Sequence, residues 1–250
     1  MHLLRVFDLI SAPAIAFWSL CASTAEAARP LRRRVVPRLG RYLSNAKIAA
    51  GAGVVVRLAV LPAMVATARA AERRGFGVVR WLGLPGLVGT AAAMVALDWG
   101  IYWWHRKNHE VPALWKRHLI HHQDVDLDVS TAFRFDALEV LFSVPVRCAQ
   151  VALAGASPGA VVAYETLLQL MTVFHHSNLD LGSLDDWLRP VVVTPCMHGT
   201  HHSVVERELQ SNWGVVFSVW DRLHGSFRAE GDAHGVVVGL ASDWKTRRES

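Results

Sequence analysis

Histidine is the residue type whose spacing first indicates chemistry in this chain of 250 residues. HRKNH at 105–109, HLIHH at 118–122 and HGTHH at 198–202 place imidazoles three and four positions apart, and HHSN at 175–178 adds two more. On a helix, residues three and four apart share a face, so each motif would aim its imidazoles in one direction. The repeated HxxHH spacing therefore predicts a metal site assembled from separate parts of the chain.

The number and type of these ligands restrict the metal chemistry. Zinc takes about four protein ligands in structural sites and about three in catalytic sites, so the histidines of the motifs are numerous enough for two metal ions. Imidazole binds zinc, copper, iron and nickel, which leaves the metal open. Because the motifs offer almost only nitrogen donors, the metals would be more electron-poor than in carboxylate sites. That property fits activation of O2 for attack on an inert C–H bond.

The same histidines would also suit a non-redox membrane protein that binds or transports metal. Transport proteins normally place their polar ligands within the membrane spans, whereas these histidines follow the apolar runs. The oxygen-activating interpretation is therefore preferred.

The composition is that of a membrane protein. Hydrophobic residues make up 52% of the chain, the mean hydropathy is +0.24 and there are ten tryptophans. The net charge of +5 is uneven, because basic residues concentrate at 29–47 between two apolar runs. The positive-inside rule predicts this pattern, so we expect no nucleic-acid partner. Three cysteines lie far apart without a CxxC motif, which excludes a disulfide framework or a zinc ribbon.

Five apolar runs are expected to form the helices that position the histidines. These runs lie at residues 3–22, 48–68, 82–104, 138–154 and 158–174. A run of about 20 apolar residues can cross a bilayer. The sequence therefore predicts an all-α integral membrane helical bundle of four or five spans, with a helical cap that holds a histidine-rich dimetal site. GASPG at 155–159 suits a tight reversal, which would return His175 and His176 to the membrane face of His105.

Charge near the runs predicts their orientation. The first run is expected to be a retained span rather than a cleaved signal peptide, because the basic stretch at 29–47 follows it. Basic residues place that stretch, the histidine site and the C-terminus on the cytoplasmic face of a multi-pass protein. The arginines between 69 and 80 then lie on the opposite side, which a re-entrant or interfacial early segment would explain. Arg57, the charge within the second run, is expected to snorkel toward the headgroups.

An aromatic belt at the membrane edge is expected at Trp99, Trp103 and Trp104, where interfacial anchoring explains these residues and lining of a lipid entry is the alternative. Ligating histidines usually donate their second ring nitrogen to a carboxylate or carbonyl. We expect a few of the nearby acidic residues to take this role and the others to be solvated: Asp98, Glu110, Asp124, Asp126, Asp128, Asp180, Glu206 and Asp221. Glu139 and Arg134 are spaced to pair only loosely.

The histidine motifs, in this order and flanked by apolar hairpins, resemble those of the fatty acid hydroxylase and sterol desaturase superfamily of membrane-bound di-iron oxygenases. STAFRFDALE at 130–139, HHSN at 175–178, and NWG with WDRLHGSF at 212–227 are similar to further segments of that superfamily. The resemblance covers 82–227, and it leaves 1–81 as N-terminal membrane segments with a basic loop and 228–250 as a C-terminal tail. It implies that two irons are held by His105, His109, His118, His121, His122, His176, His198, His201 and His202.

The resemblance also implies an activity. O2 would be the co-substrate for hydroxylation or desaturation of an aliphatic carbon of a lipid, and we favour hydroxylation because it needs fewer steps. No catalytic residue beyond the metal ligands is implied. Because the sequence holds no CxxC cluster and no GxGxxG after a predicted strand, electrons would come from an external ferredoxin, cytochrome or reductase.

Three positions stand apart from the shared pattern. Many relatives carry a His-Pro pair where this chain has Asp136 and Ala137, so a role at that position would be altered. His175 adjoins His176 and would point about 100° away from it on a helix, which leaves its role open. His224 is expected to have a surface role rather than to bind metal.

Overall fold

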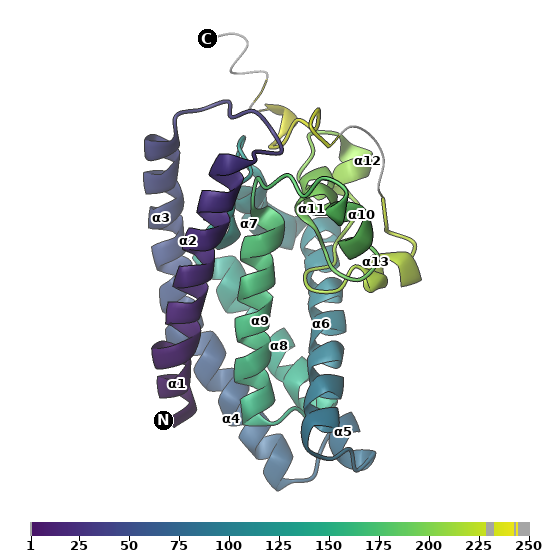
Figure 1. Ribbon diagram of the computed structural model, residues 1–250. Helices are drawn as coiled ribbons and strands as arrows, with labels where there is room; N and C mark the ends of the chain where they lie inside the picture. The colour runs from purple at the N-terminus through teal and green to yellow at the C-terminus, as the bar shows by residue number, and fades with distance from the viewer. Residues whose placement is uncertain (1, 229–232, 243, 245–250) are drawn as a thin grey trace.

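Long helices run side by side in this protein, and short helices cover one end of them (Figure 1). The computed structural model describes residues 2–228, 233–242 and 244. Within those residues the secondary structure is helical apart from three isolated bridges, so the all-α prediction is confirmed.

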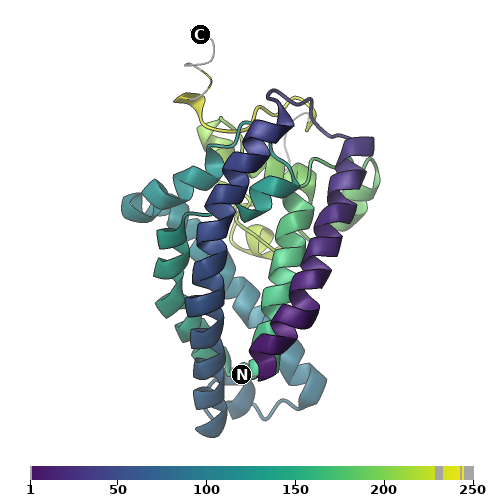
Figure 2. The ribbon, with the colours of Figure 1, turned by 90° about the vertical axis from the view of Figure 1, so that its left-hand side faces the viewer.

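The long stretches follow one another in opposite directions along the bundle. The first half of the chain forms α1 (His2–Val6), the π-helical turn η1 (Phe7–Ser11), α2 (Ala12–Ala28), α3 (Arg38–Val55), the π-helical turn η2 (Val56–Val60), α4 (Leu61–Arg73), α5 (Val78–Trp81) and α6 (Gly86–Glu110). The second half forms α7 (Pro112–His122), the 3-10 helix η3 (Val129–Phe133), α8 (Ala137–Ala154), α9 (Pro158–His176), α10 (Leu184–Leu188), α11 (Pro195–His201), α12 (Glu206–Leu209) and α13 (Val219–Leu223). In Figure 1 the short helices α10 to α13 lie toward the end of the bundle away from the N-terminus, whereas α5 lies at the N-terminal end, and Figure 2 shows the bundle turned by 90°.

Three helical stretches are long and apolar enough to cross a membrane, namely Leu3–Ala28, Arg38–Trp81 and Ala137–Ala154. The runs at 82–104 and 158–174, which we also expected to be spans, form most of α6 and α9 and do not meet the same criterion. Their acidic residues Asp98 and Glu165 face the protein interior, where they are 1% and 7% exposed. These two helices therefore supply the polar centre of the bundle as well as part of its apolar core.

The first helix is an integrated part of the fold. Glu26 near the end of α2 is 1% exposed, and its carboxylate accepts hydrogen bonds from the backbone N–H groups of Val129 and Asn178. These contacts tie α2 to the segments around the second and third histidine motifs, and retention of this segment stays a prediction.

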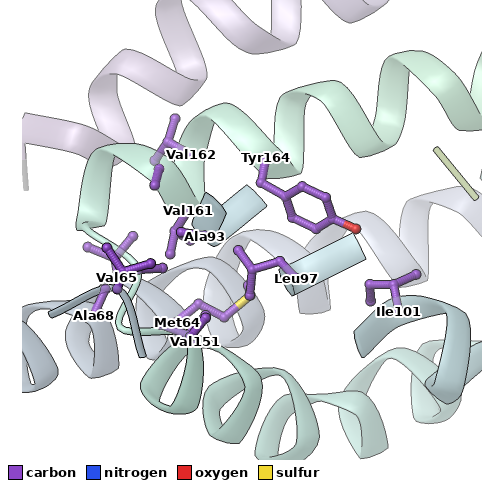
Figure 3. Close-up of a cluster of buried hydrophobic side chains, with 14 of the residues drawn as sticks. Met64, Val65, Ala68, Ala93, Leu97, Ile101, Val151, Val161, Val162 and Tyr164 are labelled. Carbon is purple, nitrogen blue, oxygen red and sulfur yellow. The ribbon is translucent and has the colours of Figure 1, made fainter. Parts of the chain in front are cut away.

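The apolar core is packed from α4, α6, α8 and α9 (Figure 3). Large side chains such as Met64, Leu97 and Tyr164 interlock with small ones, which include the fully buried Ala68 and Ala93. Small residues let helices approach closely, which is how helices associate where lipid removes the hydrophobic driving force. The core thus holds α6 and α9 in fixed register, and both of these helices end in histidines.

The reversal predicted at GASPG is confirmed and is itself packed against an earlier turn. Gly155 ends α8 in the left-handed conformation with φ 71°. Gly77 has φ 105°, and a Cβ atom there would lie 2.3 Å from the backbone nitrogen of Gly155. Both glycines are required because two backbones touch at this point.

Arg57 differs from the expectation that it would snorkel alone. Its Nε and Nη2 atoms donate to the two carboxylate oxygens of Asp8 at 2.9 and 2.7 Å. The two residues lie in η2 and η1, and both side chains are 42% exposed on the bundle surface. Arg57 pairs with Asp8 because a bidentate ion pair neutralises two charges that would each be costly on an apolar surface.

The basic stretch at 29–47 forms ion pairs and hydrogen bonds with the loop after the second histidine motif. Arg34 pairs with Asp128 at 2.6 Å, and Arg41 pairs with Asp124 at 2.6 Å. Asp126 accepts hydrogen bonds from the backbone N–H groups that follow Arg34. Part of the basic charge therefore neutralises buried carboxylates within the protein, in addition to any role beside the membrane.

Candidate metal centre

The structure brings all nine predicted histidines together at the capped end of the bundle. They form two groups, and within each group one ring nitrogen per residue lies within 4.8 Å of all the others. The first group contains His105, His109, His118, His122 and His201. The second contains His121, His176, His198 and His202. Every member is 8% exposed or less, so the groups are shielded from solvent.

Helical spacing explains how the two HxxHH motifs are divided. In α7, His118 and His122 are four apart and enter the first group, while His121 turns to the second. The order is reversed at α11, where His198 and His202 enter the second group and His201 the first. Each motif therefore contributes to both groups, which fits one centre with two adjacent metal positions.

Hydrogen bonds at the Nδ1 atoms fix the orientation of several rings. A carbonyl oxygen can only accept a hydrogen bond, so each Nδ1 facing one carries the proton and leaves a lone pair on Nε2. The carbonyl partners are Trp213 for His105 at 2.9 Å, Arg134 for His121 at 3.1 Å, Thr172 for His176 at 2.7 Å and Ser211 for His201 at 2.7 Å. These rings are thus set to present a free nitrogen to the interior of the cluster.

Contacts between Nε2 atoms in the second group call for a cation. The Nε2 atoms of His121 and His176 are 3.0 Å apart, and those of His176 and His198 are 3.1 Å apart. Since His121 and His176 both donate through Nδ1, their Nε2 lone pairs face each other. Burial lowers the pKa of His176 to about 3, so a proton is not available at neutral pH to separate them. A bound metal ion would satisfy both lone pairs.

The first group offers unpartnered nitrogens in the same way. Both ring nitrogens of His109 and His122 are buried without a hydrogen-bond partner, as are the Nε2 atoms of His118 and His201. Burial lowers the pKa of His201 to about 3, which keeps its imidazole neutral and able to bind metal. Buried polar atoms normally have partners, so this concentration of free nitrogens fits a second metal position.

Glu139 bonds to a histidine of the cluster, a role that the sequence analysis did not assign to it. Its Oε1 atom accepts a hydrogen bond from His118 Nδ1 at 2.8 Å, and both side chains are buried. The suggested partner Arg134 instead donates to the carbonyl of Ile120 and to Asn45. Asp136 caps α8 through the backbone N–H groups of Leu138 and Glu139, and this sets the first turn of α8 against α7. The signal available in the sequence was this N-cap followed by a glutamate.

Among the acidic residues that we expected beside the ligands, Asp98 and Asp221 support the centre through the backbone and not through a histidine ring. Asp221 accepts from the backbone N–H groups of Trp213 and Gly214, both at 2.8 Å, and burial raises its pKa to about 6. Asp98 accepts from the Trp220 ring at 2.7 Å. These carboxylates hold the segment whose Trp213 carbonyl orients His105.

Two further histidines lie near the centre but outside both groups. His175 is 1% exposed, its Nδ1 donates to the Val215 carbonyl at 3.1 Å, and its ring centroid lies 4.1 Å from that of His198. His224 stacks on Tyr102 with ring centroids 5.0 Å apart and accepts a hydrogen bond from Trp99 at 3.0 Å. His224 is therefore half-buried among aromatic rings, where we had expected an open surface position.

A cavity of about 170 Å³ opens beside the second group and extends between the helices of the bundle. Histidines line one end, and apolar side chains that include Ile101, Trp104 and Leu168 line much of the remainder. A larger cavity of about 510 Å³ lies between η1–α2 and α3–η2. The two cavities adjoin, because they share the lining residues Val56, Phe135, Val140 and Gln169.

The described residues thus form a helical bundle with three membrane-length apolar stretches, nine clustered imidazoles that could hold metal and an adjoining apolar cavity. The model of the fatty acid hydroxylase family matches residues 90–226. The chain belongs to the fatty acid hydroxylase family.

Individual relatives are more distant. Alkylglycerol monooxygenase of Homo sapiens is 32% identical over 152 residues, which are 59% of this chain and 32% of that protein. Ornithine lipid hydroxylase of Rhizobium tropici is 32% identical over 155 residues, 59% of this chain and 44% of the relative. Cholesterol 25-hydroxylase of Rattus norvegicus is 22% identical over 152 residues, 60% of this chain and 50% of the relative. The chain thus covers half or less of these relatives, and no solved structure gives a significant match.

Proposed function

We propose that this chain is a membrane-bound lipid hydroxylase that holds two irons in its nine clustered histidines. The observation that carries the proposal is the set of Nε2 contacts at 3.0 to 3.2 Å in the second group, where oriented lone pairs meet. When bound, the irons would supply the reductive activation of O2 that oxidises an aliphatic C–H bond. Electrons would come from an external ferredoxin, cytochrome or reductase.

The protein's own residues perform the positioning. Backbone carbonyls and Glu139 hold the imidazole Nδ1 protons and so aim the Nε2 atoms inward. Burial keeps the rings neutral and excludes water from the cluster. The apolar cavity beside the second group would lay a lipid chain next to the metals, and the adjoining cavity toward α2 and α3 would let that chain enter from the bilayer. Fixed metal ligands combined with a dry, shaped cavity are what a protein contributes to such chemistry.

The named activities of the relatives support hydroxylation over desaturation. Alkylglycerol monooxygenase, ornithine lipid hydroxylase and cholesterol 25-hydroxylase are each named for addition of oxygen to a lipid. We therefore propose O2 as the co-substrate and one added oxygen atom in the product.

Metal content and lipid products test the proposal. The purified full chain should bind about two irons, and in cells it should add one oxygen to a lipid in an O2-dependent reaction. His121→Ala should lose iron and activity, whereas His224→Ala should retain both irons, because His224 lies outside the two groups. Zinc alone, with no oxygen-dependent turnover after full iron loading, would identify a non-redox metal-binding or transport protein instead.

We further propose that the histidine centre faces the cytoplasm. The support is the basic stretch at 29–47, which lies at the same end of the bundle as the cap (Figure 1). A cysteine introduced at the exposed Arg38 should react with an impermeant thiol reagent in opened cells and stay protected in intact cells. Labelling in intact cells would reverse the orientation.

A further inference from the structure

The cavity beside the histidines carries polar groups where its other walls are apolar. Arg147 on α8 and Gln169 on α9 both line it. Arg147 Nη2 forms an ion pair with Glu165 of α9, and the two side chains are only 11% and 7% exposed. Ionisable side chains between the helices of a membrane bundle are costly, and they commonly mark the path of a substrate.

Two hydrogen-bond donors in this place have no acceptor. Arg147 Nε and Gln169 Nε2 are both buried and make no hydrogen bond within the protein. Leaving a buried donor unpaired is destabilising, so such atoms in a native cavity call for a partner that the protein does not provide. Both atoms are donors, which means that the missing partner is an acceptor.

The position of these donors relative to the metal centre follows from helix geometry. Glu139, Ser143 and Arg147 are spaced four apart on one face of α8, and all three line the cavity. With 1.5 Å of rise per residue, Arg147 lies about 12 Å along the helix from Glu139. Since Glu139 bonds to His118, the backbone of Arg147 lies about two helical turns along α8 from the level of the histidines.

Charge at this place restricts the kind of acceptor. The carboxylate of Glu165 neutralises the guanidinium of Arg147. A phosphate or carboxylate of the ligand would bring an uncompensated negative charge into the bundle, whereas a neutral ether, ester or hydroxyl oxygen would not. The subsite is thus suited to a neutral oxygen.

We propose that Arg147 and Gln169 form a recognition subsite for a neutral oxygen carried within a lipid chain, at the level of Arg147, about 12 Å along α8 from the histidine-bonded Glu139. The substrate class is then a long-chain lipid with an ether, ester or hydroxyl oxygen at that distance, in preference to an unsubstituted chain. Glu165 is a positioning residue, because it holds Arg147 and does not itself face the oxygen. This inference rests on the proposed lipid hydroxylase function for the identity of the ligand.

Binding to the full-length protein in lipid nanodiscs tests the subsite without turnover. The two probes are a long-chain alkane with a single mid-chain ether oxygen and the same alkane with a methylene in that position. The metal-free wild-type protein should bind the ether probe about tenfold more tightly, the ratio expected for a hydrogen bond to a charged donor. Moving the ether oxygen along the chain should give a single preferred position.

Variants then assign the preference to the named side chains. Gln169→Leu leaves the ion pair intact and should reduce the preference severalfold, and the double variant Arg147→Met with Glu165→Leu should abolish it without leaving an unpaired charge. Arg80→Met is the matched control, because Arg80 pairs with Glu72 at 2.8 Å outside the cavity, and it should keep the full preference. Equal binding of both probes by the wild type, or an undiminished preference in the double variant, would overturn the subsite.

Turnover separates this proposal from the proposed function. If the iron-loaded protein oxidises neither probe and no cellular lipid while the binding preference is intact, the hydroxylase proposal fails and the subsite stands. If it oxidises both probes equally and binds them equally, the subsite fails and the hydroxylase proposal stands.

Discussion

Glu139 provides the sharpest test of how this protein builds its metal centre. The His118 Nδ1 atom donates to Glu139 at 2.8 Å, and both side chains are at most 5% exposed. Asn108 Nδ2 donates to the same oxygen at 3.3 Å, which holds the carboxylate in place. Replacement by glutamine keeps the shape and an acceptor but removes the negative charge, while replacement by alanine removes the acceptor altogether.

The expected magnitude follows from that hydrogen bond. A buried hydrogen bond to a charged group contributes about 1.5–3 kcal/mol, which corresponds to roughly 10- to 100-fold in an equilibrium constant. Loss of a partner that orients a metal-bound histidine typically costs metal affinity over the same range. We expect iron to bind about tenfold more weakly to Glu139→Gln and up to about 100-fold more weakly to Glu139→Ala.

Iron affinity is measured by competition with a chelator on folded, purified protein, together with thermal stability of the metal-free form. Glu26→Gln is the matched control, because Glu26 is equally buried but bonds to Arg34 and to backbone N–H groups away from the histidines. It should lower stability and leave iron affinity per folded molecule unchanged. Wild-type iron affinity in both Glu139 variants would refute the assignment of Glu139 to His118.

Three further outcomes follow from the structure. Burial lowers the pKa of His201 from 6.5 to about 3, so the unfolded chain binds more protons than the folded protein below pH 6.5. The metal-free protein should therefore lose thermal stability as the pH falls below 6.5. A constant Tm from about pH 7 to 5 would contradict this. Arg41→Met leaves the buried Asp124 without its arginine partner and leaves Asp128 with Arg34 alone, so it should lower Tm on the order of 10 °C. Arg38→Met at an exposed position should not. Gly77→Ala places a Cβ atom 2.3 Å from a backbone nitrogen at φ 105° and should lower the free energy of unfolding by about 3 kcal/mol. Gly75→Ala is the control, because its Cβ meets no atom within 4 Å, and its effect should be several times smaller. Similar effects of the two variants in a denaturation assay would exclude the close backbone contact.

The sequence predicted the members of the site because helical spacing carries that information. The HxxxH spacing and the four-apart pair within each HxxHH put imidazoles on one side of a helix, whereas the middle histidine of each HxxHH turns to the other group and not in the single direction that we expected. The GASPG reversal returns α9 to the end of the bundle where α6 finishes. The helical class and the gathering of the histidines were therefore accessible from local pattern and chain reversal. Ligation of metal by these residues stays a prediction.

The hydrogen bonds and ion pairs that orient the histidines and hold their helices could not be predicted from the sequence in the same way. Four of the ring orientations depend on backbone carbonyls, which every residue has and which leave no side-chain signature. The pairs Arg34–Asp128 and Arg57–Asp8 join positions far apart in the sequence, so no local spacing reveals them. Glu139 was visible as a residue type, but its partner depended on how the cap at Asp136 turns α8 toward α7.

The carbonyl groups that orient the imidazoles also set an order of events during biosynthesis. The ring of His105 is oriented by the Trp213 carbonyl and that of His201 by the Ser211 carbonyl. The hydrogen-bond acceptor of His105, which lies in α6, is thus synthesised more than a hundred residues later. A nascent chain that has exposed only its first two histidine motifs lacks the histidines of the later motifs. It also lacks the Trp213 carbonyl that orients His105. The assembled histidine cluster therefore exists only after the closing segment at 211–217 has been synthesised, and a metal bound by the proposed centre would enter after that point.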